Sequence, residues 1–254
     1  MFPIQDSVPT RNPAFVVWTL IGVNVLVFLH QISLPPHLLE AFLREYALIP
    51  ARFFGPLAQV APPQGPADWA PFATNMFLHG GWMHLIANMW TLWLFGPAVE
   101  DRLGPGRFLA FYLACGVAAS WAHAAMNPTS MLPALGASGA IAGVIGCYVR
   151  MFPLARIVIM APLGFIPIFF EVHAIAFALF WFLSQILPGL MTLGQSADVG
   201  GVAWWAHIGG FVAGWVLAPW VRLPASARRP YFADEGRMGF APDGSRRRVR
   251  GPWG

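Results

Sequence analysis

Long apolar stretches recur along the chain, and they constrain its fold more than any other feature of the sequence. A helix needs about 20 apolar residues to cross the hydrocarbon core of a bilayer. Hydrophobic residues make up 57% of the 254 residues and charged residues only 10%, whereas soluble domains carry about 25% charged residues. The sequence therefore predicts an all-α polytopic membrane protein with six membrane-spanning helices. The expected spans are residues 14–34, 72–99, 107–126, 138–152, 172–187 and 201–221.

The six expected spans form one domain, residues 14–222, between a polar N-terminal segment, residues 1–13, and an Arg/Pro/Gly-rich tail, residues 223–254. The low hydrophobicity of the tail predicts that it is disordered. After the first span, His37–Tyr46 has the amphipathic pattern of a short helix that lies in the plane of the membrane interface. Three prolines interrupt the apolar residues 153–170, which predicts irregular interfacial structure there.

Polar and helix-breaking residues are expected to end two of the spans. Glu100, Asp101 and Arg102 follow the second span and predict its return to water. Pro188 and Gly189 predict the end of the fifth span. The fourth span is rich in glycine and alanine, and small residues let helix backbones approach closely in lipid. We therefore expect the fourth span to be buried among the others.

The distribution of basic residues predicts the orientation in the membrane. All 15 basic residues are arginines. With six spans, the two termini and the loops after the second and fourth spans share one side, which holds 13 of the 15 arginines, and the other side holds only Arg44 and Arg52. Basic residues concentrate on the cytoplasmic side, so both termini are predicted to be cytoplasmic, in the inner membrane of a bacterium. We interpret the run Arg246–Arg248 as a solvated or lipid-contacting tail rather than a nucleic-acid site.

No pattern typical of a metal or cofactor site occurs in the sequence. It contains no CxxC pair, no HExxH, no glycine-rich phosphate loop and no paired carboxylates within an expected span. Cys115 and Cys147 both lie within apolar stretches, which is typical of small core residues rather than of a disulfide or a metal pair. We therefore expect neither a metal nor a cofactor.

A serine between glycines opens the fourth span, within Gly136–Gly139. The second, fourth and sixth spans all run from the outer face inward, and His84, Ser138 and His207 each lie in the outer half of one of them. These three side chains can therefore meet at one shallow depth below the outer surface. Asn88 lies four residues after His84, which places both on one face of the second span.

This arrangement predicts a serine nucleophile with a histidine base. A serine hydroxyl attacks poorly until a base takes its proton, and His207 can act as that base for Ser138. No Asp or Glu lies at the same depth in an expected span, so the residues favour a dyad over a triad. The tetrahedral intermediate needs fixed hydrogen-bond donors. His84 and Asn88 can donate from their side chains, and the N–H of Ser138 can donate from the start of a helix.

Other interpretations of the same residues remain open. The glycines around Ser138 also fit close packing between membrane helices, with the hydroxyl bonded to its own backbone. A histidine such as His207 can bond a neighbouring helix without taking part in chemistry. His79, His123 and His173 lie near the ends of expected spans, where an imidazole costs little, and we interpret them as structural. A small transporter would need inverted repeats and a central polar site, and the sequence has neither.

Three motifs, taken in chain order, resemble those of the rhomboid family of intramembrane serine proteases, and the resemblance covers about residues 14–222. The motifs are His84-x-x-x-Asn88 with the following Gly96–Gly104, then Gly136-x-Ser138-Gly139, then Ala206-His207-x-x-Gly210-x-x-x-Gly214. The glycines Gly136, Gly139, Gly210 and Gly214 are interpreted as motif and packing residues.

The resemblance implies a six-helix bundle with a half-submerged first loop and a water-filled cavity open to the outer face. It also implies that Ser138 is the nucleophile, that His207 is the base, and that His84 and Asn88 assist the oxyanion. The implied substrates are single-pass transmembrane proteins, cleaved near the outer face of the membrane after a small residue. The resemblance implies no particular oligomeric state.

Two departures from the family's pattern are visible. Trp69 is followed by Ala70, where the first loop of the family often carries Trp-Arg, so the loop must be anchored differently. Ala142 stands four residues after Ser138, where some members place an aromatic ring on the catalytic imidazole, so another side chain must hold His207. The alternative function is a catalytically silent rhomboid-like protein that binds other membrane proteins. Such relatives typically lack the serine or the histidine, and this chain has both.

Overall fold

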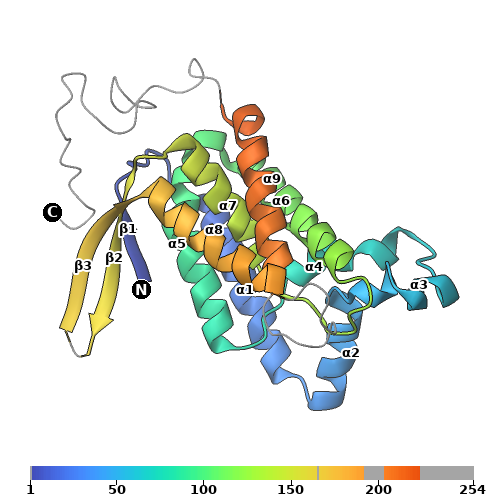
Figure 1. The fold of residues 1–254 in the computed structure, drawn as a ribbon. Helices are drawn as coiled ribbons and strands as arrows, with labels where there is room; N and C mark the ends of the chain where they lie inside the picture. Colours follow the sequence, from blue (N-terminus) through green and yellow to red (C-terminus); the bar gives the residue numbers. More distant parts are fainter. Residues whose placement is uncertain (1, 165, 192–202, 224–254) are drawn as a thin grey trace, which may run out of the picture.

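The computed structural model describes residues 2–164, 166–191 and 203–223, which form a helical bundle with a small antiparallel sheet (Figure 1). The longer helices are α1 (Phe15–Ser33), α5 (Trp82–Leu103), α6 (Pro105–Met126), α7 (Ser138–Met151), α8 (Ala174–Met191) and α9 (Trp204–Val221). The shorter helices are α2 (Pro36–Tyr46), α3 (Pro56–Val60) and α4 (Pro71–Thr74), with 3-10 turns at Pro50–Arg52, Pro66–Trp69 and Asn75–Phe77. The strands are β1 (Phe2–Asp6), β2 (Arg156–Leu163) and β3 (Ile166–His173). The tail that the sequence predicts to be disordered lies outside the described residues from residue 224 onward.

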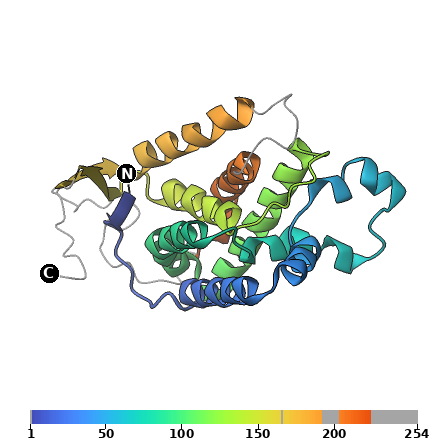
Figure 2. The ribbon, with the colours of Figure 1, turned by 90° about the horizontal axis from the view of Figure 1, so that it is seen from below.

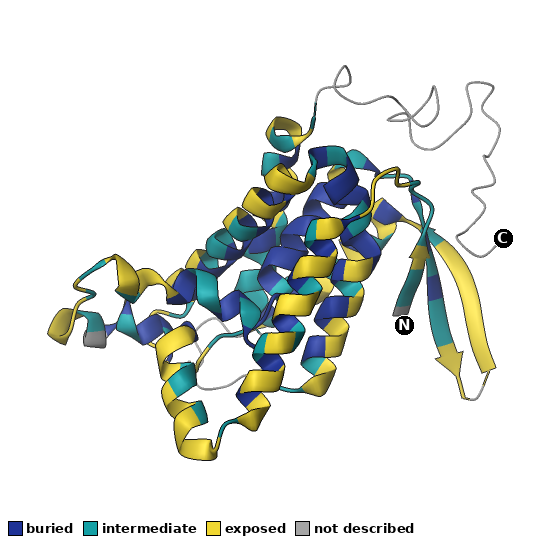
Figure 3. Cartoon of the chain, turned by 180° about the vertical axis from the view of Figure 1, so that it is seen from behind, coloured by how far each residue is buried: buried dark blue, intermediate teal, exposed yellow. Residues whose placement is uncertain are grey.

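Three of the described helices, α1, α6 and α8, are long and apolar enough to cross a membrane. Large apolar side chains are exposed on the outer faces of α1 and α8, among them Phe15, Leu26, Leu179 and Phe180. Figure 3 shows the buried residues gathered in the interior of the bundle and the exposed ones along its outer helices. A helix surface that exposes this much apolar area is suited to contact with lipid rather than water.

Helix α7 occupies the centre of the bundle. Every residue from Gly139 to Val149 is buried, and α7 packs against α5, α6, α8 and α9. Figure 2 shows α7 between α8 on one side and α1 and α5 on the other. The expectation that this segment is buried among the others is confirmed. Cys147 on α7 and Cys115 on α6 are both buried free thiols, as the sequence predicts.

Glycines let the backbones of α7 and α9 touch. A Cβ atom added to Gly210 would overlap the carbonyl oxygen of Gly139, and one added to Gly214 would overlap the carbonyl oxygen of Gly143. Small residues at a helix interface permit this approach in a membrane. The contact holds the first turns of α7 and α9 side by side, and these turns carry Ser138 and His207.

The second helical span differs from its prediction at both ends. Helix α5 begins at Trp82 rather than at Phe72, because α4 and a 3-10 turn take up the residues before it, and it continues to Leu103. The expectation that Glu100 and Asp101 mark the return to water is therefore wrong, since their exposed fractions are only 3% and 5%.

The buried carboxylates of α5 hold the N-terminal end of α1. The two Glu100 oxygens accept hydrogen bonds from the backbone N–H groups of Val16, at 3.0 Å, and Val17, at 2.8 Å. Asp101 accepts two more from Asn12, at 3.1 Å from the backbone and 2.8 Å from the side chain. The first N–H groups of a helix have no partner within it and carry the positive end of its dipole. Carboxylates can therefore be buried here because the start of α1 supplies their donors.

The all-α prediction holds only in part, because the described residues are mostly helical but include a small sheet. The prediction of irregular structure over residues 153–170 is wrong, because β2 and β3 form an antiparallel hairpin there. Ile157 and Ile159 alternate inward along β2 and are buried. Pro162 faces Pro167 near the tip of the hairpin, where a proline costs the ladder little. Strand β1, within the N-terminal segment expected to be merely polar, pairs with β2 in the order β1-β2-β3.

Two further helices can be compared with their predictions. The amphipathic helix expected at His37–Tyr46 is confirmed as α2. The expected end of the fifth span at Pro188 and Gly189 is wrong, because α8 continues through both to Met191. Proline is tolerated inside membrane helices, where neighbouring groups satisfy the backbone that it frees.

Candidate active site

A turn that only glycine adopts readily precedes Ser138. Gly136 has a φ of 128°, a backbone conformation that L side chains rarely adopt. Its N–H donates to the carbonyl oxygen of Asn75 at 2.9 Å, which ties the turn to the segment before α5. A Cβ atom at Gly136 would lie 2.8 Å from the ring of His84. Glycine is therefore required here both for the turn and for the space that the His84 ring occupies.

Ser138 and His207 form a direct contact between α7 and α9. The Nε2 atom of His207 lies 2.8 Å from the Oγ atom of Ser138. Ser138 is the first residue of α7, and His207 lies in the first turn of α9. The structure thus brings together the serine and the histidine that sequence analysis singled out, at hydrogen-bond distance.

Gln185 on α8 contacts the other nitrogen of the same imidazole, and sequence analysis did not single it out. Its Oε1 atom lies 2.6 Å from the Nδ1 atom of His207. An amide oxygen can only accept a hydrogen bond, so Nδ1 must carry the proton. Nε2 is then unprotonated and accepts a hydrogen bond from the Ser138 hydroxyl. An amide side chain within an apolar span is a feature of the sequence that could have pointed to it.

Two tryptophans flank the His207 ring. The centroid of the Trp181 ring lies 6.0 Å from that of His207, and the Trp204 ring meets it edge-on at 6.4 Å. Ala142 leaves no aromatic ring on α7 to pack there. The side chains that hold His207 therefore come from α8 and from α9 itself.

His84 and Asn88 both lie on α5, and each side chain carries a hydrogen-bond donor. The Nδ1 atom of His84 accepts the N–H of Gly80 at 3.4 Å, which leaves Nε2 to carry the proton. The point where a Gly136 Cβ would stand lies 2.8 Å from the His84 Nε2 atom and 3.7 Å from the Ser138 Oγ atom. The Nδ2 atom of Asn88 is buried without a hydrogen-bond partner among the described residues. Because buried donors are rarely left unpaired, this group is a candidate to bind an atom that the substrate supplies.

His79 lies beside His84, in the segment before α5. It is only 2% exposed, so it does not sit at an open interface as the sequence suggests. Its ring meets that of His84 edge-on, with centroids 5.2 Å apart. Burial, together with the proximity of His84, lowers the pKa of His79 to about 4, so this imidazole is neutral at pH 7. In the described part of the chain, no three His, Cys, Asp or Glu side chains are arranged to hold a metal ion.

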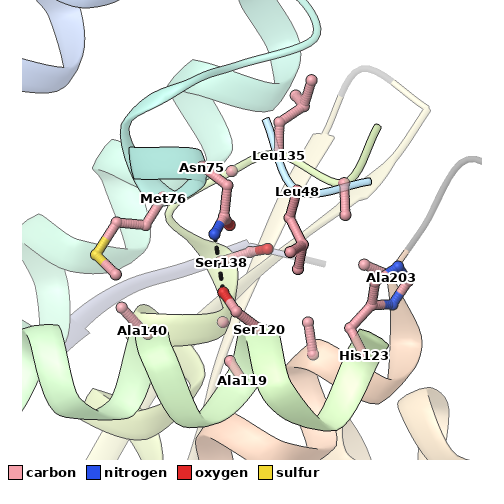
Figure 4. A pocket seen from close by; sticks show the side chains of 15 residues that line it. Leu48, Asn75, Met76, Ala119, Ser120, His123, Leu135, Ser138, Ala140 and Ala203 are labelled. Carbon is pink, nitrogen blue, oxygen red and sulfur yellow. Dashed lines mark hydrogen bonds between the residues drawn. The ribbon is translucent and has the colours of Figure 1, made fainter. Parts of the chain in front are cut away.

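A small cavity of about 20 Å³ lies beside Ser138 (Figure 4). Ser120, His123 and Asn75 line it together with Ser138. The Nδ2 atom of Asn75 donates to the Ser120 Oγ atom at 2.8 Å across it. A space of this size with several polar partners suits one water molecule. Sequence analysis identified none of the three residues that surround Ser138 here as part of the site.

Comparison with known proteins places the chain in a family. The Rhomboid domain matches residues 66–224, which is more than half of the chain. The chain belongs to the rhomboid family. Rhomboid proteins are integral membrane proteins, and most, although not all, are intramembrane serine proteases. The resemblance seen in the three motifs is thereby confirmed at the level of the family.

Curated relatives include both bacterial and mitochondrial rhomboids. The chain is 31% identical over 157 residues to the rhomboid protease GluP of Bacillus subtilis, a match that covers 62% of this chain and 27% of that protein. It is 31% identical over 153 residues to the mitochondrial rhomboid protein 1 of Saccharomyces cerevisiae, covering 58% of this chain and 40% of that protein. The chain thus matches less than half the length of either relative.

Proposed function

We propose that this rhomboid is an intramembrane serine endopeptidase that cleaves single-pass transmembrane proteins near the outer face of the membrane. The observation that carries the proposal is the 2.8 Å contact between the Ser138 Oγ atom and the His207 Nε2 atom. The imidazole is held so that its unprotonated nitrogen faces the hydroxyl, which is the arrangement that general-base activation of a serine requires.

The reaction begins with attack of the Ser138 hydroxyl on the carbonyl carbon of the scissile bond. His207 takes the hydroxyl proton on Nε2 and then gives it to the leaving amine, so that the peptide C–N bond breaks and an acyl-enzyme remains. A water molecule then attacks the ester with His207 again as base, which releases the carboxylate product and restores Ser138. The cavity lined by Ser120 and His123 is suited to hold that water next to the ester.

The oxyanion of each tetrahedral intermediate needs donors that are already in place. Asn88 supplies an unpaired Nδ2 group, His84 supplies its Nε2–H, and the first backbone N–H groups of α7, including that of Ser138, have no partner within the helix. Each such donor contributes about 3 kcal/mol to transition-state stabilisation in comparable sites. These groups therefore form the oxyanion hole in our proposal.

The membrane placement that we propose uses α1 and α5–α9 as six spans, with α2 lying in the outer interface. The N-terminal ends of α5, α7 and α9 then meet below the outer face, and both termini are cytoplasmic, as the arginine distribution favours. The proposed location is the inner membrane of a bacterium. The tail contacts water or lipid rather than nucleic acid.

A helical substrate hides the carbonyl of the scissile bond in its own hydrogen-bond ladder. Cleavage therefore requires a locally unwound stretch, which Gly, Pro and other helix-weakening residues favour. The resemblance to the family adds a small residue before the scissile bond. Neither a metal nor a cofactor enters the reaction.

The test is cleavage of a transmembrane reporter substrate in liposomes. We expect the wild-type protein to cut the reporter, and Ser138→Ala and His207→Ala each to abolish cutting while keeping the melting temperature of the wild type in detergent. Full cleavage by either variant would falsify the dyad. A wild-type protein that binds the reporter without ever cutting it would instead favour the silent, binding-only relative.

A further inference from the structure

We propose that Gln185 is a positioning residue that sets the protonation pattern of His207 and fixes its ring toward Ser138. The role rests on the proposed serine protease function. It assigns to α8 a part in the chemistry, in addition to the residues of α5, α7 and α9 already described.

The hydrogen bonds around Gln185 run in one consistent direction. The Ser184 Oγ atom donates to the carbonyl oxygen of Trp181 at 2.6 Å. The Gln185 Nε2 atom donates to the Ser184 Oγ atom at 2.8 Å, which turns the amide so that Oε1 faces the imidazole. Oε1 then accepts the Nδ1 proton of His207 at 2.6 Å. This chain leaves one arrangement for His207, with the lone pair of Nε2 toward the serine.

The burial of Gln185 supports a specific role for it. Four residues of α8 are buried, Ala174, Ala178, Gln185 and Gly189, and the other three are small. Burying an amide side chain among such residues costs free energy unless its polar atoms form hydrogen bonds. Gln185 makes them on both of its polar atoms, and one of them is to the base of the site.

A neutral amide in this place differs from the carboxylate of a serine protease triad. The carboxylate orients the histidine and also stabilises the imidazolium that forms during the reaction. Gln185 can orient the ring through the same Nδ1 atom, but it supplies no negative charge. It also avoids the large cost of an ionised carboxylate among apolar helices. Gln185 therefore orients the His207 ring without stabilising the positive charge of the imidazolium, and these two effects can be tested separately.

The variants Gln185→Leu and Gln185→Glu make that test, with Asn24→Leu as the matched control. Asn24 is a fully buried amide on α1 that bonds the carbonyl of Leu20 and does not contact the site. We expect Gln185→Leu to lower kcat by about 10- to 100-fold, the range for a misplaced catalytic group, with little change in KM. Gln185→Glu keeps an acceptor for Nδ1, so it should retain most of the activity. It should also move the acidic limb of the pH–rate profile to higher pH, because a carboxylate stabilises the protonated imidazole.

A second measurement reports on His207 without any catalysis. In protein labelled with ¹⁵N-histidine, the His207 signals are identified by their loss in His207→Ala. We expect the wild type and Asn24→Leu to show His207 protonated on Nδ1 and unprotonated on Nε2, and Gln185→Leu to show a mixture of the two neutral forms.

The outcomes separate this role from the proposed function. If Gln185→Leu keeps the wild-type kcat, pH profile and Nδ1-protonated imidazole, Gln185 is only a packing residue and the inference is overturned. A wild-type protein without protease activity refutes the proposed function, and the spectrum then decides alone whether Gln185 sets the protonation of His207. A loss of kcat in Gln185→Leu that Asn24→Leu matches equally would attribute the effect to the burial of amides in general, and would also overturn the role.

Discussion

The two ends of the helical bundle bury polar groups in opposite ways. Toward the end that carries Ser138, the buried groups are amides, imidazoles and a hydroxyl, and the Nδ2 atom of Asn88 has no hydrogen-bond partner in the described part of the chain. At the end that carries β1 and the start of α1, the buried groups include Glu100 and Asp101, and their oxygens accept hydrogen bonds from the N-terminal segment. At the first end a buried donor has no partner among the described residues, whereas at the second end the buried carboxylate oxygens accept hydrogen bonds within the fold.

The glycine contact between α7 and α9 holds the helices that carry Ser138 and His207 together, and breaking it should have the largest effect. Gly210→Ala would push a methyl group onto the Gly139 carbonyl oxygen, a backbone atom that cannot move aside. We expect a loss of at least about 3 kcal/mol in stability, the upper range for overpacking, together with loss of activity. Denaturant-induced unfolding in mild detergent measures the loss of stability.

The control for this prediction is Gly22→Ala on α1, where the added Cβ would meet no atom of another packed element within 4 Å in the described part of the chain. This variant should be neutral or slightly stabilising, since alanine favours a helix over glycine. Equal losses in both variants would show that glycine flexibility, and not the α7–α9 contact, is what matters.

Asn88→Ala should separate catalysis from stability at the Ser138 end. Removal of one oxyanion donor lowers kcat by about 100-fold. Because the Nδ2 group of Asn88 has no hydrogen-bond partner among the described residues, we expect the free energy of unfolding to stay the same or to rise. Turnover of a reporter substrate and unfolding measured on the same preparation test both halves. A fall in stability that accounts for the fall in turnover would contradict the account.

Glu100→Gln should give the opposite pattern. The variant weakens the charged hydrogen bonds to the N–H groups of Val16 and Val17, and bonds to charged groups contribute about 1.5 to 3 kcal/mol each. We expect a loss of about 2 kcal/mol in stability, with kcat per folded molecule unchanged. A selective loss of kcat would mean that this end of the bundle takes part in the chemistry.

A further predicted effect is a pH dependence at Asp6 of β1, whose carboxylate accepts a hydrogen bond from the Tyr148 hydroxyl at 2.9 Å. Burial raises the pKa of Asp6 from 3.8 to about 7, and the hydrogen bond from Tyr148 opposes this only in part. The folded protein therefore binds a proton that the unfolded chain releases between pH 4 and 7, so stability falls as pH rises through this window, by up to about 1.4 kcal/mol per unit. The difference in melting temperature between pH 5 and pH 7 should be smaller in Asp6→Asn than in the wild type. An identical difference in variant and wild type would contradict the assignment.

The sequence predicted the Ser138 end better than the opposite end, for a physical reason. The length of the apolar stretches predicts the helical segments, and polar residues within them are costly, so their depth pointed to Ser138, His207 and His84, which the structure brings close together. Charged residues at the end of a span, such as Glu100, are normally solvated. Their burial depends on a partner that lies 84 residues away in the chain.

Other features depend on contacts that no local pattern contains. The prolines of the β2–β3 hairpin made its sequence look irregular. They lie near the tip of the hairpin, where they do not interrupt the ladder of hydrogen bonds. The sequence shows Gln185 as a polar residue within an apolar span. The orientation of its side-chain amide, however, depends on the hydrogen bond to Ser184 and on the packing of α8 against α9. Such side-chain contacts between helices become visible only once the helices are placed.

The most direct test of the central claim is the reaction of the wild-type protein with a fluorophosphonate, with the site of modification mapped by mass spectrometry. We expect a single adduct on Ser138 that is absent from Ser138→Ala, strongly reduced in His207→Ala, and undiminished in Asn24→Leu. An unmodified wild-type protein, or an adduct that persists in Ser138→Ala, would contradict it.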